Sequence, residues 1–127
     1  MRFHFLSIAA VLLGAVVLPA AANAESFSKL AGQGYAVGPL GQGRSGGLGW
    51  VLSKGDKKFF CRMRVSAAYR GRDGMVSFTS SGRMIAVDRA TFEAAIGGPD
   101  PTIPRLEDLK AGRVKPANVG SCAPVRK

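Results

Sequence analysis

Hydrophobic and polar positions alternate most regularly between residues 48 and 70. Leu48, Trp50 and Leu52 occupy every second position, a turn-like segment follows at residues 54–57, and a longer alternation comes after it. Successive side chains of a strand point to opposite faces, so the pattern predicts a hairpin whose second strand has two unlike faces. The apolar face is predicted to carry Phe59, Cys61, Met63, Val65, Ala67 and Tyr69. The opposite face is predicted to carry Phe60, Arg62, Arg64, Ser66, Ala68 and Arg70.

Further short elements follow from turn and capping residues. Residues 71–74 and 81–82 are typical of tight turns, which places two more strands at about 75–80 and 83–87. Helices are expected where a capping residue or proline is followed by a helical segment that stops at glycine. These segments are residues 27–31, 89–96 and 105–111. The predicted fold class is α+β: a small antiparallel meander of four or five strands, with one or two short helices packed on its apolar face.

A glycine-rich segment precedes the predicted hairpin. Residues 38–49 contain six glycines, and ordering them costs much backbone entropy, so we expect a mobile loop or a loose edge hairpin. Residues 41–46 match the spacing of a dinucleotide-binding fingerprint. That motif requires a helix immediately afterwards, whereas strand-like sequence follows here. The match therefore predicts no cofactor.

The first 24 residues have the organisation of a secretory signal peptide. Arg2 precedes an uncharged and largely apolar run over residues 5–18, and residues 22–24 supply the small-x-small pattern of a cleavage site. The run is shorter than the roughly 20 apolar residues that span a bilayer. We predict cleavage between Ala24 and Glu25, export to the periplasm or the medium, and no transmembrane segment in the mature chain. Residues 25–127 are then expected to form a single α+β domain.

Two cysteines, Cys61 and Cys122, are the only ones in the chain. Export places them in an oxidising compartment, so a disulfide between them is expected. This bond would tether the C-terminal tail, residues 114–123, to the strand that carries Cys61. A zinc site is not expected, because the only histidine, His4, lies within the signal peptide, and two cysteines alone cannot complete such a site.

The basic residues suggest what kind of partner the chain binds. Without residues 1–24 the net charge is +9, which favours anionic surfaces. Outside the cytoplasm these are acidic glycans, lipid head groups or envelope polymers, and no nucleic acid is expected. A solvated cationic face that only keeps the protein dispersed is the alternative. The candidate anion-binding residues are Lys57, Lys58, Phe60, Arg62, Arg64, Arg70 and Arg72.

Catalytic arrangements find little support in the sequence. A Ser-His-Asp or Cys-His site lacks its base, because the mature chain has no histidine. The pairs Ser28-Lys29 and Ser53-Lys54 leave serine–lysine chemistry formally open, but nothing marks either lysine as activated. The acidic residues are scattered over turns and caps. We therefore expect a non-enzymatic protein with no catalytic residue, no metal and no cofactor.

Residues 27–61 contain a series of short motifs. Leu30-Ala31-Gly32-Gln33-Gly34-Tyr35-Ala36-Val37 is followed by Trp50 to Gly55 and then by Phe59-Phe60-Cys61. The pattern resembles small exported proteins of alphaproteobacteria whose function is unknown. The resemblance implies a periplasmic location and a hairpin that ends at a cysteine, and it carries over no active-site residue.

Two functions remain in view. The leading hypothesis is a periplasmic or secreted module that binds an anionic envelope component through the cationic sheet face. The alternative is a protein–protein module, such as a small inhibitor of an envelope or host enzyme.

Overall fold

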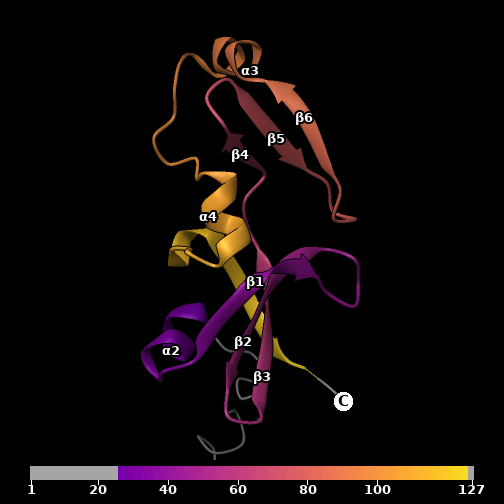
Figure 1. The fold of residues 1–127 in the computed structure, drawn as a ribbon, viewed down its shortest axis with the longest axis vertical. Helices are drawn as coiled ribbons and strands as arrows, with labels where there is room; N and C mark the ends of the chain where they lie inside the picture. Colours follow the sequence, from indigo (N-terminus) through magenta and orange to yellow (C-terminus); the bar gives the residue numbers. More distant parts are fainter. Residues whose placement is uncertain (1–25, 126–127) are drawn as a thin grey trace, which may run out of the picture.

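The structure is a computed structural model, and it describes residues 26–125. Among these residues, six consecutive strands follow the first helix, and two further helices precede the last strand, a segregated order that is expected for an α+β protein (Figure 1). In chain order the elements are α2 (Phe27–Gly32), β1 (Ala36–Gln42), β2 (Leu48–Lys54), β3 (Lys57–Met63), β4 (Ala67–Arg70), β5 (Gly74–Phe78), β6 (Met84–Asp88), α3 (Arg89–Ile96), α4 (Leu106–Ala111), the 3-10 turn η1 (Pro116–Asn118) and β7 (Val119–Pro124).

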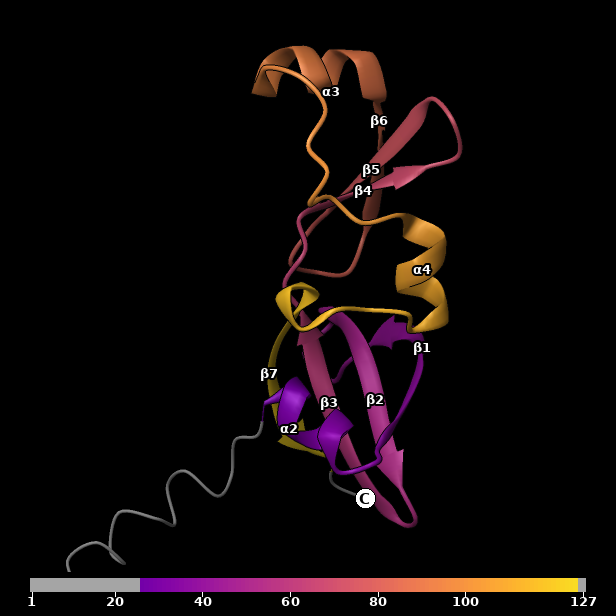
Figure 2. The same cartoon turned by 90° about the vertical axis from the view of Figure 1, so that its left-hand side faces the viewer.

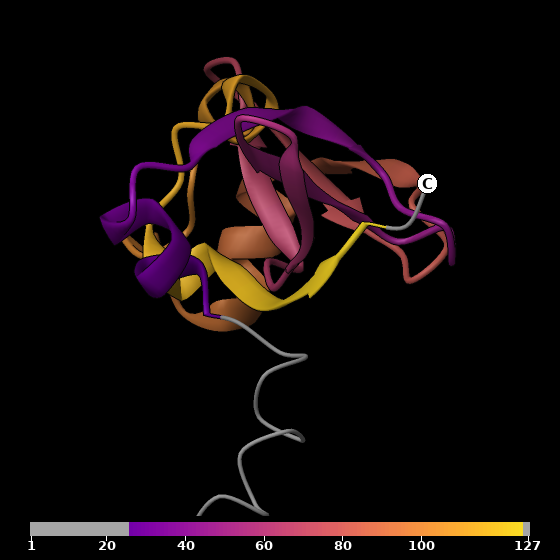
Figure 3. The same cartoon turned by 90° about the horizontal axis from the view of Figure 1, so that it is seen from below.

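The strands form two antiparallel sheets. Sheet A has the order β1-β2-β3-β7, and sheet B has the order β4-β5-β6. Figure 2 shows the sheets at opposite ends of an elongated molecule, with α4 beside the junction and α3 beyond sheet B. Seen from below, β1 and β7 lie at the two margins of sheet A, and α2 lies to one side (Figure 3). The α+β class is therefore confirmed.

The single long strand predicted over residues 59–70 is wrong, because the chain leaves sheet A after Met63 and enters sheet B at Ala67. Both faces of β4 are buried: Ala68 joins the main core, while Tyr69 packs in a second cluster with Met75. The in–out alternation thus ends at Met63. The backbone N–H of Arg64 donates to the carbonyl of Asn118 at 2.8 Å, which anchors the chain at this crossing point.

One core joins the two sheets. Trp50, Leu52 and Cys61 from sheet A pack together with Ala68 and Val76 from sheet B. The helices α2 and α4 cover this cluster with Leu30, Leu106 and Leu109. The indole N–H of Trp50 donates to the carbonyl of Leu109 at 2.8 Å, so one side chain ties sheet A to α4.

The helix predictions are confirmed. The hydroxyl of Ser26 accepts from the N–H of Lys29, and the carboxylate of Asp88 accepts from the N–H of Thr91. Gly97 ends α3 in a left-handed conformation, and Gly112 ends α4 in the same way. These are local interactions, which explains why the sequence alone located them.

The Gly-rich segment of residues 38–49 is a hairpin rather than a mobile loop. Most of it belongs to β1 and β2, which pair antiparallel around a tight turn, and the register shifts between Val37 and Leu40. The turn is closed by the N–H of Gly43, which donates to the carbonyl of Gly47 at 2.8 Å. The hairpin lies at the edge of sheet A, because β1 is an outermost strand of that sheet. Of the two alternatives predicted for this segment, the structure shows the edge hairpin.

The disulfide between Cys61 and Cys122 is present, and both half-cystines are buried. They face each other directly in the β3–β7 pairing, with their Cα atoms 3.9 Å apart. The tail is therefore attached to β3, as predicted, and its segment Val119–Pro124 forms a strand of sheet A. Within the described residues, none of the helices has the length and apolarity needed to cross a bilayer. The predicted signal peptide lies outside the described residues.

Candidate functional site

The excess of positive charge is concentrated around sheet A. Residues 26–66 and 113–125, called here the sheet A lobe, contain nine basic and one acidic side chain, a net charge of +8. Residues 67–112, the sheet B lobe, contain six of each and are neutral. Assigning α4 to sheet A instead changes these charges only to +7 and +1. The molecule is therefore a charge dipole, with its cationic end built on sheet A.

The outer face of sheet A carries the cationic stripe. On β3, Cys61 is buried and Phe59 packs against the core, so Lys58, Phe60 and Arg62 lie on the opposite, outward side. The register extends each position across the sheet: Phe60 is paired with Val51 of β2 and with Ala123 of β7. Three of the seven candidate residues thus share one face, with the aromatic ring between two cations.

Phe60 is accommodated by two glycines of the β1–β2 hairpin. A Cβ added to Gly43 would lie 2.6 Å from the Phe60 ring, and one added to Gly49 would also lie 2.6 Å from it. The ring therefore lies against bare backbone at both positions. Any larger residue there would displace it. The glycine-rich segment thus has a defined role, because positions without a side chain leave room for the Phe60 ring on the outer face.

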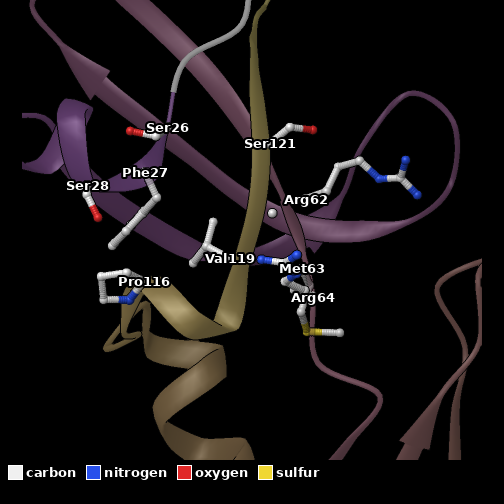
Figure 4. A pocket seen from close by; sticks show the side chains of 10 residues that line it. Ser26, Phe27, Ser28, Arg62, Met63, Arg64, Pro116, Val119 and Ser121 are labelled. Carbon is white, nitrogen blue, oxygen red and sulfur yellow. The ribbon is translucent and has the colours of Figure 1, made fainter.

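Arg62 lies where several surface hollows meet. One hollow, of about 650 Å³, straddles β7 and is lined by Arg62, Arg64 and three serines, Ser26, Ser28 and Ser121. A second, of about 470 Å³, lies on the outer face beside Phe60 and also includes Arg62 and Ser121. In Figure 4, Arg62 extends toward the β1–β2 turn, away from Phe27 and Pro116. Its guanidinium is close to Gly47, where an added Cβ would lie 4.0 Å from a terminal nitrogen.

Three cations near this face, Arg44, Lys58 and Arg62, have no ion-pair partner among residues 26–125. The ion pairs there involve other residues: Arg89 with Glu93, Arg105 with Glu107, and Arg113 with Asp108. The guanidinium of Arg62 is therefore available to an external anion, for which its planar donor fork is suited.

The other candidate residues lie elsewhere. Lys57 is on the same side of β3 as Phe59, by strand alternation. Arg64 follows the end of β3 and lines hollows at the crossing between the sheets. Arg70 ends β4, and Arg72 lies in the β4–β5 turn of the neutral sheet B lobe. The seven residues therefore do not form one continuous surface, because the strand that was expected to join them is divided.

Sequence reasoning missed several residues beside Phe60. Arg44 lies in the β1–β2 turn, Val51 is on β2, and Ala123 and Val125 belong to the C-terminal tail, yet all four line the hollow on the outer face. The disulfide was the signal that could have placed the tail there. Cys122 opposite Cys61 implies Ala123 opposite Phe60, as is observed.

The acidic groups with shifted pKa values have structural roles. The pKa of Asp88 lies below its ordinary value because the N–H and hydroxyl of Thr91 donate to the carboxylate. Thr102 lowers the pKa of Asp100 in the same way. Lys54 donates to the carbonyl of Gln33 at 2.6 Å. Within residues 26–125, no three His, Cys, Asp or Glu side chains are grouped to hold a metal ion.

No protein-family model, no curated protein and no solved structure matches this chain.

Proposed function

We propose that this chain is a non-enzymatic, exported binding module that engages an anionic component of the cell envelope through the outer face of sheet A. One observation carries the proposal: the net positive charge of the described residues lies in the sheet A lobe, and there Arg62, Lys58 and Arg44 lie near Phe60 without acidic partners in the described chain. Cations held on a sheet without counter-charges favour an external anion. The buried disulfide fits the oxidising compartment that export implies.

Charge reversal at two cations on the outer face of sheet A tests this proposal. Lys58→Glu with Arg62→Glu should weaken binding to immobilised envelope extract at least about tenfold at low salt, because exposed cations near an anionic surface each contribute about 1 kcal/mol. Both side chains are exposed, so the free energy of unfolding should change by no more than about 0.5 kcal/mol. Binding is measured by retention on the extract and stability by urea denaturation.

The matched control changes the same net charge on the other lobe. Arg70→Glu with Arg72→Glu should weaken binding much less, because these side chains lie in the sheet B lobe. Equal losses for the two double variants would mean that net charge alone matters and that the outer face of sheet A is not the site.

The proposed export of the chain can be tested separately. Intact-mass measurement of the protein recovered from outside the cytoplasm should give the mass of residues 25–127, with the cysteines oxidised. A species that retains residues 1–24 would contradict the predicted cleavage between Ala24 and Glu25.

A protein partner is the second candidate. It is favoured by β6, an edge strand of sheet B whose Met84 and Ile85 are exposed. An edge strand presents unpaired backbone groups that can pair with another chain. Such a partner would bind the neutral lobe, so its binding should survive high salt and the Lys58/Arg62 double variant.

A further inference from the structure

The hollow on the outer face of sheet A has an apolar floor and a cationic rim. Its floor is formed by Val51, Phe60, Ala123 and Val125, and its volume is about 470 Å³, within the usual range for small-molecule sites. Val51 and Val125 are 38% and 41% exposed, so the apolar surface is open to a ligand. Arg44 and Arg62 stand on its rim.

Few polar groups line this hollow. Gln42 is occupied, because its amide donates to the carbonyls of Gly46 and Ser81 at 3.1 Å each. The hydroxyls of Ser45 and Ser121 are the remaining uncharged polar side chains on its wall. The ring hydroxyls of a sugar would find few hydrogen-bond partners there, and each unsatisfied one would oppose binding. An alkyl chain has no such requirement.

Phe60, the aromatic part of this floor, is only partly exposed. Its ring lies against the backbone of Gly43 and Gly49, where added Cβ atoms would come within 2.6 Å of it. A ring that is packed against backbone is less free to insert into a bilayer than one that projects from the surface. The hollow, called here the groove, is therefore better suited to binding a single alkyl chain than to contacting a membrane surface.

We propose that this groove binds a single-chain anionic amphiphile, with the alkyl chain over Phe60 and the phosphate or carboxylate at Arg62 and Arg44. The proposal rests on the proposed function and specifies its ligand class. The head group would lie close to the neighbouring hollow of about 650 Å³, which shares Arg62 and Ser121 with the groove and is also lined by Arg64. Charge and apolar surface thus recognise opposite ends of one molecule.

Titration calorimetry with monomeric octyl, decyl and dodecyl phosphate, and with inorganic phosphate, tests the chain-binding step. The affinity of the full exported chain should rise between about twofold and fourfold for each methylene that enters the groove, and inorganic phosphate should bind weakest. Ala123→Trp fills the floor without changing charge and should abolish the dependence on chain length. Ala86→Trp, at an exposed position of β6, is the matched control and should keep it.

Arg62→Gln separates the head group from the chain. It should weaken all three alkyl phosphates by a similar factor of about ten while leaving the increase per methylene unchanged. Affinity that is independent of chain length but lost in Arg62→Gln would overturn the groove and leave the anion-binding proposal standing. Affinity indifferent to both substitutions would overturn both. Binding to anionic vesicles without binding to monomeric alkyl phosphates would overturn the groove in favour of a membrane surface.

Discussion

Replacing both Cys61 and Cys122 with alanine should lower the free energy of unfolding by about 4 kcal/mol. The bond closes a loop with a sequence separation of 61 residues, and cross-linking a loop of that length restricts the unfolded chain by about this amount. For a domain of this size the melting temperature should fall by roughly 15–30 °C. Urea denaturation and thermal unfolding followed by circular dichroism measure both quantities.

Reduction of the wild-type protein provides the control. The half-cystines are 0% and 1% exposed, so a reductant should reach them only when the chain opens. Dithiothreitol should therefore have little effect in buffer and a full effect near the unfolding midpoint. A Cys61→Ala/Cys122→Ala protein as stable as the wild type would mean that sheet A holds β7 without the bond.

Trp50→Ala should destabilise the protein by about 3–5 kcal/mol, the usual cost of removing a fully buried aromatic side chain. Trp50 is 0% exposed and lies in the core cluster that joins the two sheets. Its loss should therefore weaken the contact between sheet A and α4 as well as the interior of sheet A. Urea denaturation measures the change in the free energy of unfolding.

Trp50→Phe distinguishes packing from hydrogen bonding. It removes the donor to the carbonyl of Leu109, but that carbonyl also accepts from the N–H of Gly112 at 3.2 Å. The cost of the lost hydrogen bond should then be only about 1 kcal/mol, since the acceptor keeps a partner. Equal costs for Trp50→Phe and Trp50→Ala would contradict the core role assigned to the ring.

Local signals in the sequence located most elements. Ser26 and Asp88 cap their helices through contacts three residues away, and Gly97 and Gly112 end theirs, so neighbours in the sequence decide the outcome. The pairing of the tail with β3 followed from the predicted disulfide. This bond is a long-range constraint that could be predicted because the chain contains only two cysteines.

The division into two sheets could not be read from the alternation. Val65 and Ala67 continue the apolar pattern across the break at residues 64–66. The strand is interrupted because of tertiary packing: Ala68, which the alternation placed on the cationic face, is buried in the core cluster with residues of sheet A. A small side chain there lets sheet B pack on that core.

For the same reason, only the part of the candidate site that lies on β3 could be predicted. Lys58, Phe60 and Arg62 share a face because strand alternation holds within β3. Arg70 and Arg72 were joined to them only by the continuous strand, which does not exist. Arg44 was missed because its place beside Phe60 depends on how the β1–β2 hairpin packs, and that packing depends on Gly43 and Gly49.

Retention of the purified protein on immobilised envelope extract across a salt series tests the anion-binding proposal most directly. If the outer face of sheet A binds an anionic envelope component, retention should fall steeply as salt rises, and the retained material should carry phosphate or carboxylate groups. Retention of one protein at fixed stoichiometry, unchanged in high salt, would contradict the proposal and assign binding to a protein partner instead.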